Sequence, residues 1–471
     1  MVKIVLVGAG SAVFSKNLIA DILWHKTLGD ARLVLVDTDP ERLEVAMEMA
    51  RSINASLGAH ASISAASDRR MALDGADFVI CTIGVGGLAA TKDDIEVPLR
   101  FGVRQTIGDT LGVGGVFRAA RSIPHLLAIC RDMEELCPDA LLLNYSNPMA
   151  MHCLAVERAT RIRCVGLCHG LQMTAIWLRT LIALMDRPAE EINRHLARPM
   201  KDPKRAEEWE SWLALGKDPD FSYTCAGINH MAFFLRLESA GQDLYPKLWQ
   251  ILDMPHLLQM ESVRFELFRW LGYFMTESPL HTPEYTPYFL KDPAETAAHN
   301  LTVGIYIQGC ENLATEYRSL ADTVRTGRPV IRTPYQRTEE YASRILDAIV
   351  TDRPYVFYGN VPNHGGALIG NLPGDCCVEV PCLASKAGIT PTFVGELPPQ
   401  CAALIRTNVN VQDLAVRGIL EGSRERIYQA VMMDPNTAST LTLGRIRELC
   451  DAMFAVHADR LPANLGSNHA R

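Results

Sequence analysis

Two short segments carry a thiol and an imidazole in positions where they could meet. Cys168, in Leu167–Gly170, follows a run that is typical of a buried strand, and His230 ends the segment Gly227–His230 well downstream. A thiolate and an imidazole brought together can bind a divalent metal ion. Buried Cys and His side chains are also common in ordinary protein cores. The spacing alone therefore leaves a metal site and simple packing as alternatives.

Other polar side chains follow the ends of predicted strands. Asn144 and Asn147 stand in the turn after an apolar run, and Asp109 lies in a glycine-rich segment. Open parallel sheets bind ligands beyond the carboxyl ends of their strands, so these positions are favoured for a site. Each residue alone is equally typical of a turn or a helix cap. The same two interpretations apply to a later stretch that contains Glu277, Glu284 and Tyr285.

A glycine pair between a predicted strand and a predicted helix indicates a dinucleotide-binding loop. Gly8 would make the tight bend, and Gly10 would let the backbone approach a pyrophosphate at the helix N-terminus. Val13 stands where the full fingerprint has its third glycine, so the loop alone is weak evidence. Asp37 ends the second strand, where a carboxylate binds ribose hydroxyls and repels a 2′-phosphate, which favours NAD over NADP. The alternative is a sheet whose glycine turn binds nothing.

Strands and helices alternate over about the first 190 residues. Apolar runs predict strands over 3–7, 32–36, 77–82, 140–144 and 164–167, and helical spacing predicts helices over 14–25, 40–54 and 124–136. This alternation predicts an α/β fold with a Rossmann-type, doubly wound parallel sheet in residues 1–190.

After about residue 190, predicted strands and helices no longer alternate regularly. Residues 191–471 are predicted to form an α+β region interleaved with the first half, with helices over 264–271 and 338–350 and a strand over 377–381. The charged, proline-punctuated stretch 186–220 predicts a helical excursion that serves as a lid or an oligomer contact.

Composition excludes several classes of protein. The 471 residues are 48% hydrophobic and carry 46 Lys and Arg against 54 Asp and Glu, a net charge of −8, which excludes disorder and argues against a nucleic-acid partner. Thirteen cysteines without a CxxC pair favour a reducing, cytoplasmic location. The N-terminus lacks a secretory signal pattern, and the apolar stretch Met173–Met185 is too short to span a bilayer, so no membrane association is expected.

Taken together, the motifs resemble those of the family 4 glycoside hydrolases, and the similarity covers nearly the whole chain. It is carried by KIVLVGAGSAVFSKNLIADIL, QTIGDTLGVGG, LNYSNPMAM, GLCHG, CAGINHMAFF, GYFMTES, EYTPYF and GNVPN…NLPGDCCVEVPCL. The motifs are most similar to those of bacterial α-galactosidases of melibiose metabolism. The resemblance implies a lactate/malate dehydrogenase-like fold, and a loop that lacks the third glycine is normal for this family.

The resemblance also implies an unusual chemistry, in which NAD takes part in sugar hydrolysis. Bound NAD+ removes a hydride from C3 of the sugar, a base then removes the acidified C2 proton, and the aglycone leaves by elimination. Water adds, and the hydride is returned, so there is no net redox change. A divalent metal, usually Mn2+, stabilises the charge that develops on the sugar oxygens.

Site residues follow from the resemblance position by position. Cys168 and His230 would bind the metal, Tyr285 would be the C2 base, and either His169 or Asp109 would protonate the leaving group. The substrate contacts would come from Asn147, His169 and Glu277, with Asn360 and Asn363 as further candidates. The NAD contacts would come from Gly8, Gly10, Ser11, Ala12, Val13, Phe14, Asp37 and Asn144.

The substrate is predicted to be an unphosphorylated α-hexoside. His169 argues against the phospho-sugar subgroup, which carries Asn or Asp after the metal cysteine. The sequence Cys168-His169-Gly170 is typical of the family's α-glucosidases, whereas the rest of the chain resembles the α-galactosidases, so α-galactosides are favoured and α-glucosides or α-uronides are alternatives. The resemblance also implies a homodimer or homotetramer, and it implies that residues 191–471 form the region for substrate binding, metal binding and oligomerisation. Two other classes stay open: an NAD-dependent 2-hydroxy acid dehydrogenase and a non-catalytic NAD-binding protein.

Overall fold

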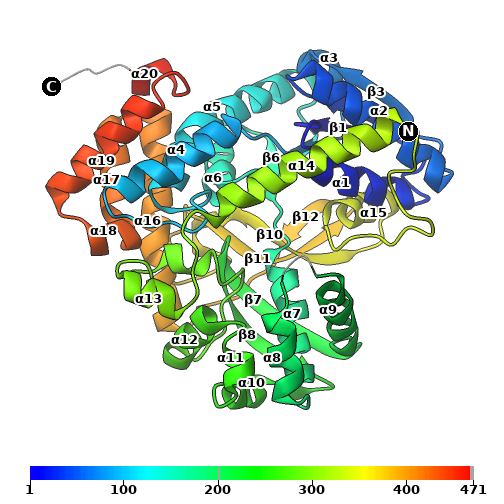
Figure 1. Cartoon of the computed structure of the whole chain (residues 1–471). Helices are drawn as coiled ribbons and strands as arrows, with labels where there is room; N and C mark the ends of the chain where they lie inside the picture. Colours follow the sequence, from blue (N-terminus) through cyan, green and yellow to red (C-terminus); the bar gives the residue numbers. More distant parts are fainter. Residues whose placement is uncertain (200–201, 467–471) are drawn as a thin grey trace.

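One twisted sheet runs through the whole molecule (Figure 1). The computed structural model describes residues 1–199 and 202–466. The strand order is β3-β2-β1-β4-β5-β6-β10-β11-β7-β8-β9, and β12 pairs with β11. The strands of the parallel part are β1 Lys3–Val7, β2 Arg32–Val36, β3 Ser62–Ala66, β4 Phe78–Cys81, β5 Leu141–Asn144 and β6 Arg163–Gly166.

The second half of the chain extends this sheet with antiparallel strands. These are β7 Phe221–Ile228, β8 Met231–Ser239, β9 Gln242–Asp243, β10 Tyr355–Pro362, β11 Cys377–Ser385 and β12 Gly388–Pro391. The sheet is therefore continuous between the two halves, and the predicted α/β class is confirmed. The division of the chain near residue 190 stays a prediction.

Helices cover both faces of the parallel part of the sheet (Figure 1). In the first half they are α1 Ala12–Trp24, α2 Pro40–Leu57, α3 Arg69–Leu73, α4 Gly87–Arg100, α5 Gly112–Leu136, α6 Met149–Ala159, α7 Gly170–Leu184, α8 Ala189–Ala197 and α9 Pro203–Leu215. In the second half they are α10 Tyr245–Ile251, α11 Pro255–Leu258, α12 Ser262–Leu271, η1 Thr282–Tyr285, α13 Pro293–Ala298, α14 Ile305–Arg325, α15 Ala342–Thr351, η2 His364–Gly366, α16 Pro399–Glu421, α17 Arg424–Met433, α18 Pro435–Thr440, α19 Leu443–Val456 and α20 Ala463–Gly466.

The predicted elements agree with this description apart from a few boundaries. Residues 186–220 are indeed largely helical, since they contain α8 and α9. The helix predicted to start at Pro124 begins at Gly112, because close packing rather than propensity governs its first turns: a Cβ at Gly114 would lie 2.5 Å from the Gly108 carbonyl oxygen. The half-polar strand β3 was not predicted, because its sequence SISAA lacks a buried apolar run.

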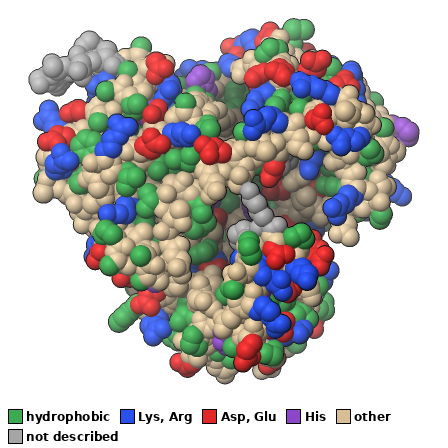
Figure 2. All heavy atoms as spheres, in the orientation of Figure 1, with side chains coloured by type: hydrophobic (Ala, Val, Ile, Leu, Met, Phe, Trp, Pro, Cys, Tyr) green, Lys and Arg blue, Asp and Glu red, His purple; other side chains and the backbone are tan. Residues whose placement is uncertain are grey.

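Two hydrophobic clusters hold the structure together. The larger one fills both sides of the parallel strands, and the smaller one joins α7, β7, β8 and α12 in the lower lobe of Figure 1. Charged side chains of both signs are interspersed on the face shown in Figure 2. Among the described residues, no helix combines the length and the apolar character that crossing a bilayer requires.

Candidate active site

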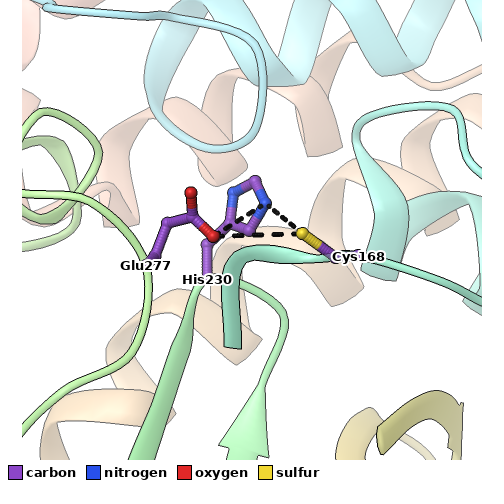
Figure 3. A group of neighbouring side chains, drawn as sticks. All are labelled: Cys168, His230 and Glu277. Atoms are coloured by element: carbon purple, nitrogen blue, oxygen red, sulfur yellow. Dashed lines mark hydrogen bonds and ion pairs between the residues drawn. The ribbon is translucent and has the colours of Figure 1, made fainter. Parts of the chain in front are cut away.

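A cysteine, a histidine and a glutamate from three separate segments converge beyond the end of β6. Cys168 follows β6, His230 lies in the two-residue turn between β7 and β8, and Glu277 lies in the segment after α12 (Figure 3). His230 and Glu277 have φ values of +63° and +74°. This left-handed conformation is unfavourable for residues with a side chain and is concentrated at functional sites. The fold thus holds two of the three side chains in strained backbone positions.

The three side chains place their donor atoms close together. Cys168 Sγ lies 3.3 Å from His230 Nε2 and 3.9 Å from Glu277 Oε2, and the last two atoms are 3.6 Å apart. A thiolate, an imidazole and a carboxylate form a donor set that suits a divalent transition-metal ion. The structure therefore brings together the predicted pair Cys168 and His230, and it adds Glu277, which the sequence had placed with the substrate.

Electrostatics favour a cation at this point. Burial, reinforced by the nearby carboxylates of Glu277 and Glu379, raises the pKa of the Cys168 thiol well above its usual value. Burial also lowers the pKa of His230, which keeps its imidazole neutral and able to offer a lone pair. A divalent cation would reverse the first effect, because a coordinating thiol is deprotonated. The residues present fit a metal ion.

Gly170 makes room for the Glu277 carboxylate. A Cβ built at Gly170 would collide with Glu277 Oε2, which is the flexible end of a side chain. We expect Gly170→Ala to displace this carboxylate from the cluster and to lower Mn2+ affinity by about 10–100-fold, the effect typical of perturbing a metal site without removing its main ligands. Calorimetric titration with Mn2+ measures this loss. Ala substitution at Gly444, where a Cβ would meet nothing within 4 Å, is the control, and unchanged affinity in Gly170→Ala would contradict the expectation.

A hydrogen-bonded chain links His230 to Tyr285 and His281. Tyr285 Oη lies 3.1 Å from His230 Nδ1 and 2.9 Å from His281 Nδ1, and its side chain is fully buried. If His230 Nε2 is free to bind a metal, its Nδ1 carries the hydrogen and donates to Tyr285 Oη. The phenol must then donate its own hydrogen to His281 Nδ1. His281 Nε2–H consequently faces Glu277 Oε1, at 3.8 Å.

The glycine-rich loop that follows β4 and α4 brings Asp109 close to His230 and His281. Its carboxylate accepts hydrogen bonds from Asn147 Nδ2 at 3.1 Å and from Thr110 Oγ1 at 2.8 Å. Burial acts to raise the pKa of Asp109, but His281, Arg118 and His230 outweigh this effect and the pKa lies below its usual value. Asp109 is therefore ionised at neutral pH, a state in which it accepts protons rather than donates them.

The surroundings of His169 raise its pKa, whereas those of Asp109 lower the pKa of that carboxylate. Its Nδ1 lies 3.1 Å from Glu340 Oε1, and its side chain is 55% exposed. The hydrogen bond that the His169 imidazole donates to the Glu340 carboxylate raises the pKa of His169. Of the two candidate proton donors, His169 is the one whose surroundings favour the protonated form.

Glu284 fastens the Asp109 loop to the Tyr285 segment. Its buried carboxylate accepts hydrogen bonds from the backbone N–H groups of Ile107 and Gly108, at 2.6 and 2.9 Å. Burial raises the pKa of Glu284 to about 7. Glu284 was singled out in the sequence without an assigned role in the site, and His281 was not singled out. The only signal in the sequence was the four-residue spacing of His281, which directly precedes η1, and Tyr285, which ends it.

The loop after β1 has the shape of a dinucleotide cradle. Gly8 has a φ of +92°, and a Cβ there would lie 2.8 Å from the Thr82 carbonyl carbon, while a Cβ at Gly10 would lie 2.7 Å from Asp37 Oδ2. Asp37 accepts a hydrogen bond from the Gly10 N–H at 2.7 Å. Helix α1 begins after Ser11, and no described side chain caps its N-terminus, so its N–H groups can face an anion.

The remaining residues predicted to contact NAD or substrate have different surroundings in the structure. Phe14 packs edge-on against Tyr145, Asn144 donates to the Ser146 carbonyl oxygen within its turn, and the side chains of Ala12 and Val13 lie outside the described residues. Asn360 Nδ2 donates to Glu379 Oε1 in the sheet, and Asn363 binds the backbone of Ile369. The last two asparagines thus have structural partners. All of these site assignments stay predictions.

Fold and site together define a Rossmann-type protein with a candidate metal centre beside a dinucleotide cradle. Residues 3–184 match the family 4 glycosyl hydrolases, and residues 225–437 match the C-terminal domain of that family. The chain belongs to this family and is a glycoside hydrolase.

Several individual proteins are similar to the chain. An alpha-galactosidase of Bacillus subtilis is 38% identical, with 98% of this chain and 99% of that protein covered. An alpha-galactosidase of Rhizobium meliloti is 32% identical, with 98% and 89% covered. A solved 6-phospho-alpha-glucosidase from gut microorganisms, in complex with NAD and Mn2+, has a TM-score of 0.74 at 19% identity, with 98% and 99% covered.

Proposed function

We propose that the chain is an NAD- and Mn2+-dependent α-glycosidase that acts on unphosphorylated α-galactosides. The observation that carries this proposal is the convergence of Cys168, His230 and Glu277 beside the Tyr285 hydroxyl. The Tyr285 Oη atom lies 3.1 Å from His230 Nδ1. The alpha-galactosidases of Bacillus subtilis and Rhizobium meliloti, at 38% and 32% identity, support galactose as the sugar. An alpha-glucosidase of Erwinia rhapontici, at 28% identity, makes glucose the second candidate.

When bound, NAD+ would accept and return the C3 hydride, and a divalent cation held by Cys168, His230 and Glu277 would polarise the sugar oxygens. The phenol of Tyr285 is placed to receive the C2 proton once its own hydrogen has moved to His281 Nδ1, 2.9 Å away. His169, whose protonated form is favoured by Glu340, would give a proton to the departing oxygen.

Asn147 is suited to orient the sugar. Its Nδ2 donates to Asp109, whereas its buried Oδ1 has no hydrogen-bond partner among the described residues. A buried carbonyl oxygen without a partner is costly, so a ligand group that donates to it, such as a sugar hydroxyl, would be stabilising. Asp109, ionised, would accept a hydrogen bond from a second hydroxyl.

The proposal extends to the division of the chain into regions, its cellular location and its oligomeric state. We place the NAD-binding region in residues 1–190 and the substrate, metal and oligomer contacts in 191–471, with the lid or oligomer contact over 186–220. A cytoplasmic location fits a protein with thirteen cysteines, none of which forms a disulfide among the described residues. The homo-oligomer is proposed on the family resemblance.

One assay tests the proposed function. Nitrophenyl α-galactoside and α-glucoside are offered to the full chain with and without NAD+, Mn2+ and a reductant. We expect cleavage of the galactoside that requires both NAD+ and Mn2+ and leaves no net NADH. Stoichiometric NADH without glycoside cleavage would instead indicate a dehydrogenase, and NAD binding with every glycoside left intact would indicate a binding protein; either result overturns the proposal.

A further inference from the structure

A cavity of about 110 Å³ lies between α6, α16 and the segment 373–376 that precedes β11. The two helices pack against each other, and α16 is the long orange helix of Figure 1. The volume is many times the roughly 10–15 Å³ that one water molecule needs, yet well below the roughly 300–1,000 Å³ of pockets for drug-sized ligands. No residue of the candidate active site lines it. The cavity therefore suits a separate, small ligand.

Arginines outnumber aspartates at this cavity. The charged side chains that line it are those of Asp375, Arg406, Asp413 and Arg417. From α6, Arg158 Nη2 donates to Asp413 at 2.6 Å and to Asp375 at 3.1 Å. Arg417 donates from Nε to both oxygens of Asp413 at 3.0 Å and from Nη2 to Asp375 at 3.2 Å. Both carboxylates are thus paired with two arginines, whereas Arg406 bonds to no carboxylate among the described residues. One positive charge is left over at the cavity.

Two buried N–H groups at the cavity lack an acceptor. Gln412 lines the cavity and is 2% exposed, and its Nε2 has no hydrogen-bond partner among the described residues. The Nη1 group of Arg158 is likewise buried without a partner in the described part of the chain. Arg406 Nε donates to Asn410 Oδ1 at 3.1 Å, so that pair offers a ligand further N–H groups. Buried donors without acceptors are costly, and a ligand that accepts hydrogen bonds would remove this cost.

We infer that this cavity is a binding site for a small oxyanion of the phosphate class. Guanidinium groups bind phosphate oxygens through charge-assisted, often bidentate hydrogen bonds. Arg406 supplies the unneutralised charge, and Gln412 and Arg158 supply the buried N–H groups. A bound oxyanion joins α6 to α16 and thereby stabilises their contact. Inorganic phosphate and the phosphoryl group of a sugar phosphate share this chemistry, and the small volume favours the free ion.

Calorimetric titration of the full chain with inorganic phosphate, at constant ionic strength, tests the inference. Saturating NAD+ is present throughout, so that phosphate does not compete for the loop after β1, and glucose 1-phosphate is the second probe. Arg406→Gln removes the charge without breaking an ion pair among the described residues, and Gln412→Leu removes the buried amide. The matched controls are Arg353→Gln and Gln400→Leu, the same substitutions at exposed positions that do not line the cavity.

We expect Arg406→Gln to weaken phosphate binding about tenfold or more, as loss of a hydrogen bond to a charged group does, and Gln412→Leu to weaken it severalfold. Both controls should match the wild type. Phosphate should also raise the midpoint of thermal unfolding more in the wild type than in Arg406→Gln, because a ligand stabilises the state that binds it. Glucose 1-phosphate binding that is lost in Arg406→Gln would support the site and assign it to phosphoryl groups of larger ligands. Absence of phosphate binding in the wild type, or equal affinity in Arg406→Gln, would overturn the inference.

Discussion

Replacing Cys168 by serine should abolish Mn2+-dependent cleavage while NAD binding persists. The thiolate is the softest of the three converging donors, and a serine hydroxyl is not deprotonated by such an ion at neutral pH. We expect a loss of turnover of more than about 100-fold, since even outer-shell changes lower metal affinity or activity roughly 10–100-fold. The dinucleotide cradle begins at Gly8, directly after β1, and its described residues share no hydrogen bond with Cys168.

Two measurements separate this result from a folding defect. Mn2+ affinity should fall together with turnover, and NAD+ affinity should stay within about twofold of the wild type. Cys137→Ser is the matched control, because Cys137 is buried at the far end of α5 and lies outside the site. Wild-type turnover in Cys168→Ser would remove this residue from the metal site.

The sequence predicted the parallel half of the fold closely, because buried strands are continuous apolar runs. β1 and β2 have the predicted bounds, and α2 begins at the predicted Pro40. The predicted metal pair was also brought together, although Cys168 and His230 are 62 residues apart. Here a specific motif resemblance supplied what spacing could not, since neither residue is marked by periodicity.

What the sequence did not reveal depends on contacts between distant segments. His281 belongs to the site only because η1 folds against the Asp109 loop, and that contact is made by Glu284 with backbone N–H groups 176 and 177 residues away. The position of Glu277 within the metal cluster likewise depends on the space left by Gly170. Backbone hydrogen bonds and the absence of a Cβ leave no pattern in hydrophobicity or charge.

The second large effect is expected at Tyr285. Tyr285→Phe keeps the buried ring and removes the one hydroxyl that lies between His230 and His281. His230 Nδ1 retains Thr110 Oγ1 as a partner at 3.2 Å, so the orientation of the imidazole and hence metal binding should survive. Loss of a general base typically lowers the rate by about 10²–10⁴-fold, and we expect a decrease in kcat of this size with the KM for the glycoside little changed.

Isotope exchange distinguishes a lost base from a disturbed site. In D2O the wild type should release sugar that carries deuterium at C2, because the proposed mechanism removes and replaces that proton. Tyr285→Phe should form this product more slowly in proportion to its turnover, with Mn2+ and NAD+ affinities unchanged. Tyr288→Phe, three residues along the same segment and 51% exposed, should match the wild type throughout. Full turnover in Tyr285→Phe would assign the base to another residue, and wild-type product without deuterium at C2 would contradict proton removal altogether.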